Sequence, residues 1–240
     1  MEVRDGFIIG VYNYCDRWCE RCPFTSHCHV FADAAALDAS LDPNLKSVTD
    51  AAPLPSEAPP PPAWMEELLD DAQREPTPKK DWARMRPRIP REHRAIDARA
   101  RGYMHRTSTW LERRQTGETQ SPDEQVETIV WFHTMIAAKV NRALHVWPDH
   151  GADADVDATS DQDGSAKVAL LGIDRSHVAW LEVVQHGVVS DGEAAPFIAD
   201  LVWLGEALEQ ARPKARAFVR PAFDEPVAVA EFLVQMQRRS

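Results

Sequence analysis

The chain has 240 residues, a net charge of −11 and 44% hydrophobic residues, which suits one domain with a proper core, or one domain plus a small metal-bearing segment. No apolar run approaches the roughly 18–20 residues that a membrane span needs, so the sequence excludes a membrane-spanning protein. The apolar run at residues 7–11 is also too short for the core of a signal peptide. We therefore expect a cytoplasmic protein with no membrane partner.

The first predicted element is a short extended segment at residues 6–12, which leads into a cysteine cluster. All 4 cysteines of the chain lie in this cluster, as Cys15, Cys19, Cys22 and Cys28. In a reducing compartment, clustered cysteines favour metal ligation over disulfides. Thiolates are soft ligands that suit Zn²⁺ or an iron–sulfur cluster.

The spacing of the four cysteines helps to distinguish a zinc site from an iron–sulfur site. Zinc ribbons usually pair two distant cysteine knuckles, whereas Cys19 and Cys22 form one knuckle here and no distant second pair exists. Four ligands within one loop are more typical of a cubane cluster. We therefore predict that Cys15, Cys19, Cys22 and Cys28 bind a [4Fe-4S] cluster, with zinc as the alternative.

The ten residues from Cys19 to Cys28 resemble the C-x2-C-P-F-x3-C segment of iron-staple nucleases. The x2 and x5 spacings are also similar to those of endonuclease III-type DNA glycosylases. The resemblance implies a [4Fe-4S] cluster on Cys19, Cys22 and Cys28, with Cys15 as fourth ligand, although the first cysteine lies farther upstream in both families. It implies neither nuclease nor glycosylase activity. The spacing from Cys15 to Cys22 also matches that of radical SAM enzymes. Those enzymes usually carry an aromatic residue where this chain has Arg21, and they build a βα barrel, for which this sequence shows no strands, so we do not favour this interpretation.

Two histidines flank the last cysteine. His27 and His29 are alternative ligands to a cysteine, but we favour surface histidines that merely neighbour the site. Three aromatic side chains are expected to cover the centre and to pack the loop against the rest of the protein: Trp18, Phe24 and Phe31.

After the cysteines, the alanine-rich run at residues 30–39 favours a helix. Prolines concentrated within residues 42–62 predict a semi-rigid linker, because proline removes backbone donors and blocks regular helix. A short amphipathic helix is predicted at residues 63–73.

Four longer helices and a short last one follow. The first covers about residues 91–114 and carries Ile96, Tyr103 and Trp110 at seven-residue spacing. The second begins at Ser121, with Glu124 completing a capping box. The others are expected at residues 165–186, from residue 196 onward, and at 227–238. No strand pattern follows the cysteines. We therefore predict an all-α fold with a cysteine-rich metal-binding segment (1–40), a Pro-rich linker (41–62) and a helical bundle-like domain (63–240).

Two charged segments bear on partners. Aspartates alternate with other residues at 148–164, as they do in a calcium-binding loop. Ala158 stands where that loop needs Gly, and Gly164 stands where it needs Glu. We therefore predict a solvated loop that binds no calcium. Residues 79–114 are strongly basic. We interpret them as a helix lying against acidic neighbours, and favour this over a nucleic acid partner because the whole chain is acidic.

Two further histidines are candidates for a site within the bundle. Asp174 and His177 have the i, i+3 spacing of a bundle di-metal site, with Glu127 and His133 on the facing helix. The Glu-x-x-His motif of such sites is absent, so we favour His133 and His177 as core histidines with satisfied hydrogen bonds.

Three functional hypotheses follow from the sequence. The first is a [4Fe-4S] protein whose cluster has a structural, redox or sensing role. The second is a zinc-stapled helical module that docks a protein partner. The third is a helical-bundle metalloenzyme with a site near His133, Asp174 and His177.

Overall fold

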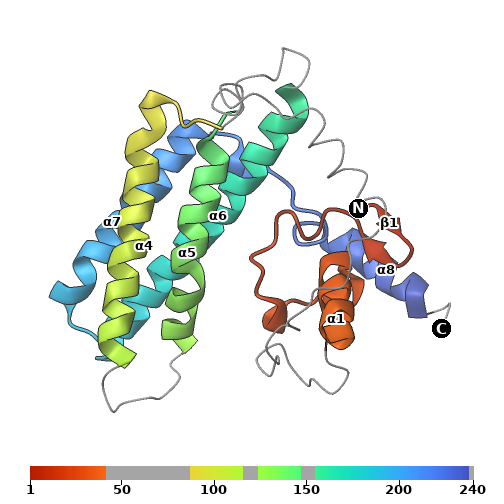
Figure 1. Ribbon diagram of the computed structural model, residues 1–240, viewed down its shortest axis with the longest axis horizontal. Helices are drawn as coiled ribbons and strands as arrows, with labels where there is room; N and C mark the ends of the chain where they lie inside the picture. Colours follow the sequence, from red (N-terminus) through yellow and green to blue (C-terminus); the bar gives the residue numbers. More distant parts are fainter. Residues whose placement is uncertain (42–86, 116–123, 147–154, 238–240) are drawn as a thin grey trace, which may run out of the picture.

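The computed structural model describes residues 1–41, 87–115, 124–146 and 155–237 (Figure 1). The fold is all-α apart from one small hairpin near the N-terminus. The predicted linker at residues 42–62, the predicted helix at 63–73 and the predicted helix cap at Ser121 lie outside the described residues. None of the described helices is both long and apolar enough to cross a membrane.

Four long helices form an up-and-down bundle. They are α4 (Arg94–Gln115), α5 (Glu124–Leu144), α6 (Asp155–Gln185) and α7 (Asp191–Ala211). Helix α5 contacts α4 and α6, and α7 also contacts α4 and α6, so each helix has two neighbours around a shared core. Figure 1 shows each helix running opposite to the one before it. This confirms the predicted bundle.

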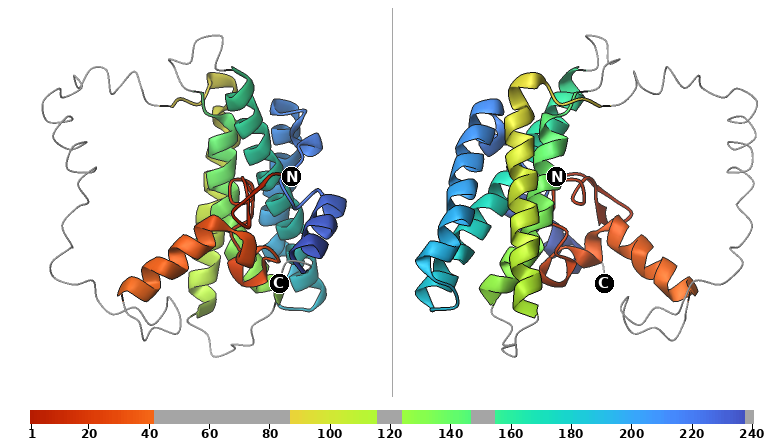
Figure 2. Two further views of the ribbon diagram at one scale, coloured as in Figure 1. Left: turned by 90° about the vertical axis from the view of Figure 1, so that its right-hand side faces the viewer. Right: turned by 60° about the vertical axis from the view of Figure 1, so that its left-hand side comes forward.

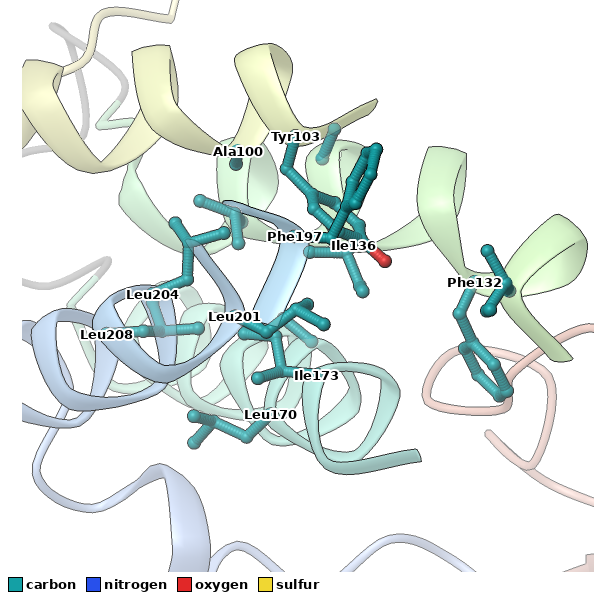
Figure 3. Packing of buried hydrophobic residues seen from close by; sticks show 14 of the residues in the cluster. Ala100, Tyr103, Phe132, Ile136, Leu170, Ile173, Phe197, Leu201, Leu204 and Leu208 are labelled. Atoms are coloured by element: carbon teal, nitrogen blue, oxygen red, sulfur yellow. The ribbon is translucent and has the colours of Figure 1, made fainter. Parts of the chain in front are cut away.

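The bundle core contains the residues that the helical spacing predicted. Ile96, Tyr103 and Trp110 are all buried on α4. The ring of Trp180 on α6 stacks on that of Phe197 on α7, with 4.3 Å between centroids. Figure 3 shows the inward side chains of the four helices meeting along the bundle. Burying each such apolar side chain contributes about 1.5–3 kcal/mol before the cost of chain entropy.

A second, smaller hydrophobic cluster joins the two ends of the chain. Strands β1 (Val3–Arg4) and β2 (Phe7–Ile8) form the antiparallel hairpin, and α8 (Pro226–Gln237) lies beside it (Figure 1). Four buried side chains make the centre of this cluster: Ile8, Val11, Ala222 and Phe232. Helix α1 (His29–Leu41) follows the cysteines and projects away from the bundle (Figure 2).

The basic helix α4 is compensated within the protein. Arg99 and Arg106 both bind the carboxylate of Asp200 on α7, which is buried. Arg101 pairs with Asp97 one turn earlier on α4. The predicted pairing of basic residues with acidic neighbours is therefore confirmed for Arg99, Arg101 and Arg106 of α4, whereas residues 79–86 lie outside the described part of the chain.

Two predicted boundaries are wrong. Helix α6 begins at Asp155, so the loop predicted at 148–164 is helical from that residue onward, while residues 147–154 are not described. Arg142 of α5 donates two hydrogen bonds to Asp161, at 2.8 and 3.0 Å, which ties this acidic segment to the bundle. Helix α7 begins at Asp191 rather than near residue 196, because the Ser190 side chain accepts a hydrogen bond from the Glu193 N–H.

The expectation that His133 and His177 belong to the core is also wrong, because both are half-buried. On α5 the core is filled by Phe132 and Ile136, which lie one position before and three after His133. The apolar stripe is therefore rotated away from the histidine.

Candidate metal centre

The cysteine loop (residues 13–28) reverses direction between its cysteines. Arg17 has a φ of 57°, in the left-handed region, and so turns the chain between Cys15 and Cys19. A 3₁₀ turn, η1 (Cys19–Arg21), follows, and the Cys22 N–H donates to the Cys19 carbonyl at 3.2 Å. A second turn, η2 (Thr25–His27), leads to Cys28. These turns replace regular helix and bring separated sulfurs to the same side of the loop.

All four cysteines line one small cavity of about 20 Å³. All four are free thiols, with Cys15, Cys22 and Cys28 half-buried and Cys19 exposed. The cavity walls are otherwise mostly apolar, and they include the three aromatic residues that the sequence singled out. The larger apolar side chains of the lining are Val11, Trp18, Phe24, Phe31 and Phe223.

The thiols also influence one another electrostatically. Burial raises the pKa of the Cys19 thiol, and the neighbouring Cys15 and Cys22 raise it further. Burial likewise raises the pKa of Cys22, opposed in part by a hydrogen bond from the Phe24 N–H to its sulfur at 3.4 Å. Without a cation, Cys19 and Cys22 therefore favour their protonated form, and a metal bound by these two thiols would have to displace those protons.

The four thiols line the cavity, but their sulfurs are not positioned together as a complete set of metal ligands. In the described ranges, no three side chains of His, Cys, Asp or Glu lie close enough together to hold one metal ion. The Cys15 Sγ instead lies 3.5 Å from the Tyr12 carbonyl, in donor position. Because Cys19 and Phe31 are exposed, this side of the cavity has room to rearrange around a metal.

The neighbouring histidines are engaged outside the cavity. His27 Nδ1 lies 3.1 Å from the Gly6 carbonyl, and its ring meets Phe232 edge-on. His29 Nδ1 lies 2.7 Å from the Asp33 carboxylate on α1. Neither lines the cysteine cavity. This agrees with the interpretation that they only neighbour the site.

Residues between the cysteines dock the loop on the bundle. Trp131 on α5 donates from Nε1 to the Asp16 carbonyl at 2.8 Å, and its ring stacks on Trp18 with 5.3 Å between centroids. The Asp16 carboxylate binds Arg175 on α6 at 2.6 Å. The loop is therefore held by contacts to two helices.

Arg21 adds a third docking point. Its guanidinium binds Glu124 at 3.1 Å and Glu127 at 2.7 Å, both on the first turn of α5. It also lies 4.0 Å from the Trp18 ring centroid. Sequence reasoning missed these partners, because ion pairs between distant segments leave no local pattern.

The residues of the third hypothesis are not assembled into a site. His133 Nδ1 lies 2.7 Å from the Val130 carbonyl on its own helix. Asp174 binds the guanidinium of Arg216. In the part of the chain that the structure describes, neither of these residues nor His177 belongs to a metal-binding group.

Comparison with family models, with curated proteins and with solved structures gave no match for this chain. The resemblance of Cys19–Cys28 to iron-staple nucleases therefore stays a prediction from the local pattern.

Proposed function

We propose that the protein holds a metal centre on the thiolates of Cys15, Cys19, Cys22 and Cys28. The observation that carries this proposal is that all four cysteines, spread over residues 15–28, line one cavity. The bundle supplies a rigid support, because the loop is clamped to α5 and α6 by residues between the ligands. Such support restricts the positions of ligands and so favours metal binding.

We favour a [4Fe-4S] cluster as the occupant, with a structural, redox or sensing role. Four thiolates from one short loop suit such a cluster, which supplies one-electron chemistry when bound. The cavity lining is mostly apolar, and the Phe24 N–H donates a hydrogen bond to the Cys22 sulfur. Low water access and hydrogen bonds to sulfur are two means by which proteins set the reduction potential of a cluster.

The zinc alternative is favoured by one observation. A cavity of about 20 Å³ accommodates a single ion or water, since one water needs about 10–15 Å³ measured in this way. A zinc ion would require less movement of the lining than a four-iron cluster. In that case the loop is a structural staple, and the helical domain that it supports would dock a protein partner.

Metal analysis of anaerobically purified protein tests the proposal. Iron and sulfide at about four each per chain, with broad absorbance near about 400 nm, would support the cluster. One zinc per chain without colour would support the alternative. Protein that carries neither metal after purification and reconstitution, with all four thiols reactive, would overturn the proposal.

A further inference from the structure

A groove of about 720 Å³ lies between the cysteine loop and the bundle. This volume is within the range of about 300–1,000 Å³ that small-molecule sites occupy. Its walls come from residues 16–23, from the first half of α5 and from the second half of α6, with Phe223 completing them. Cys22 lines both this groove and the cysteine cavity. A bound molecule would therefore lie beside the proposed metal centre, although its binding does not require the centre.

The charges that line the groove are unequal, because four carboxylates face two guanidiniums. Both guanidiniums are already engaged, which argues against an anionic ligand. Among the described residues that line the groove, Glu182 is the charged side chain with no ion pair or hydrogen bond. The other three carboxylates are bound by arginines: Asp16 by Arg175, Glu124 by Arg21 and Asp174 by Arg216.

The surroundings of Glu182 suit a cation that carries an apolar group. Val178 lies one helical turn earlier on the same face of α6 and is 53% exposed. Elsewhere in the groove, aromatic rings already lie against cations. Arg21 lies 4.0 Å from the centroid of Trp18, and the Arg175 guanidinium carbon lies 5.4 Å from that of Phe132.

We propose that this groove binds a small organic cation, an amine or guanidine with an apolar or aromatic arm. The positive group pairs with the Glu182 carboxylate, and the arm lies against Val178. The groove therefore discriminates by charge, because an anion of the same shape would meet Glu182 and find both lining arginines occupied.

Ligand-observed NMR titration of the full chain tests this, with phenethylamine as the cation and 3-phenylpropionate as an anion of closely similar shape. We expect saturable binding of phenethylamine with a Kd in the millimolar range or below, as a fragment of this size allows. Binding of 3-phenylpropionate should be at least about tenfold weaker. Equal binding of the two probes, or no saturable binding of phenethylamine, would overturn the proposal.

Two variants locate the site. Glu182→Gln removes the charge and should weaken phenethylamine binding about tenfold, which corresponds to about 1.4 kcal/mol. Val178→Arg keeps the carboxylate but places a competing guanidinium one turn away, and should also weaken binding by about tenfold or more. Glu206→Gln on the exposed side of α7 is the matched control and should leave binding unchanged. Full binding by both groove variants would place the ligand elsewhere and refute the assignment.

Metal content measured on the same samples separates this inference from the proposed function. Charge-selective binding that depends on Glu182 supports the groove even if the protein holds no metal. If the protein is loaded with metal but binds neither probe, the metal centre is supported and the assignment of the groove is refuted.

Discussion

The close approach of Tyr14 to α6 gives the sharpest test of how the cysteine loop is docked. Gly164 lies in α6, and a Cβ placed there would come within 2.8 Å of Phe218 Cζ and closer still to the ring of Tyr14. Contacts of this kind essentially never occur, so the Tyr14 ring would have to move. Since Tyr14 directly precedes Cys15, this movement would disturb the metal loop.

Gly164→Ala should therefore destabilise the protein despite its better helix propensity. Alanine in place of a helical glycine contributes about 0.5–1 kcal/mol of stability. Overpacking typically costs about 1–3 kcal/mol, so the net loss should be about 1 kcal/mol, within a range of about 0–2.5 kcal/mol. Gly205→Ala in α7 is the matched control, because its Cβ would meet only Ile173 Cγ2, at an ordinary 3.7 Å. That variant should be stabilised by about 0.5–1 kcal/mol.

Urea unfolding followed by circular dichroism measures both free energies, and hydrogen exchange reports on the loop. We expect Gly164→Ala to lose stability and to speed up exchange in the cysteine loop, while Gly205→Ala does neither. If Gly164→Ala gains as much stability as Gly205→Ala and exchange in the loop is unchanged, the docking of Tyr14 on α6 is refuted.

Three further predictions concern the loop and the C-terminal segment. Cys22→Ser should lower metal content and unfolding free energy together, and a variant with full metal content would remove Cys22 from the ligand set. Trp131→Phe keeps a ring against the loop but loses the bond to the Asp16 carbonyl, so urea unfolding should show a loss of about 1 kcal/mol, and an unchanged free energy would contradict that contact. Arg220 holds the pKa of Asp224 below its ordinary value. The carboxylate therefore stabilises the fold above the unfolded-state pKa of about 3.9, and this contribution is lost as the pH falls through the folded-state pKa. Asp224→Asn should cost about 0.5–1 kcal/mol at pH 7 and progressively less in acid, whereas a cost independent of pH would argue against the ion pair.

The helices of the bundle could be predicted because their core is repetitive. Ile96, Tyr103 and Trp110 recur every seven residues, and burial of one helix face imposes that period. The start of α6 could not be predicted in this way, because its first turns are rich in aspartate. Its position depends on tertiary contacts, such as the ion pair between Arg142 and Asp161.

The contacts around the site were harder to predict from the sequence than its cysteines. Sequence spacing identified four cysteines that share a cavity, because all of them lie within one short loop. The docking contacts join segments far apart in the chain, as Arg175 and Asp16 do. The packing of Phe232 of α8 with Ile8 spans almost the whole sequence. Such contacts depend on the complete fold and leave no periodic signal.

X-ray absorption at the iron and zinc edges tests the central claim most directly, because it reports the atoms bound to the metal. The four-cysteine centre predicts a first shell dominated by sulfur, at about 2.3 Å for zinc, with the iron edge showing sulfur ligation if the occupant is the cluster. The sulfur ligation should be lost in Cys22→Ser protein or reduced to an incomplete set. A first shell of oxygen and nitrogen, or a spectrum unaffected by this substitution, would contradict a metal centre held by the four cysteines.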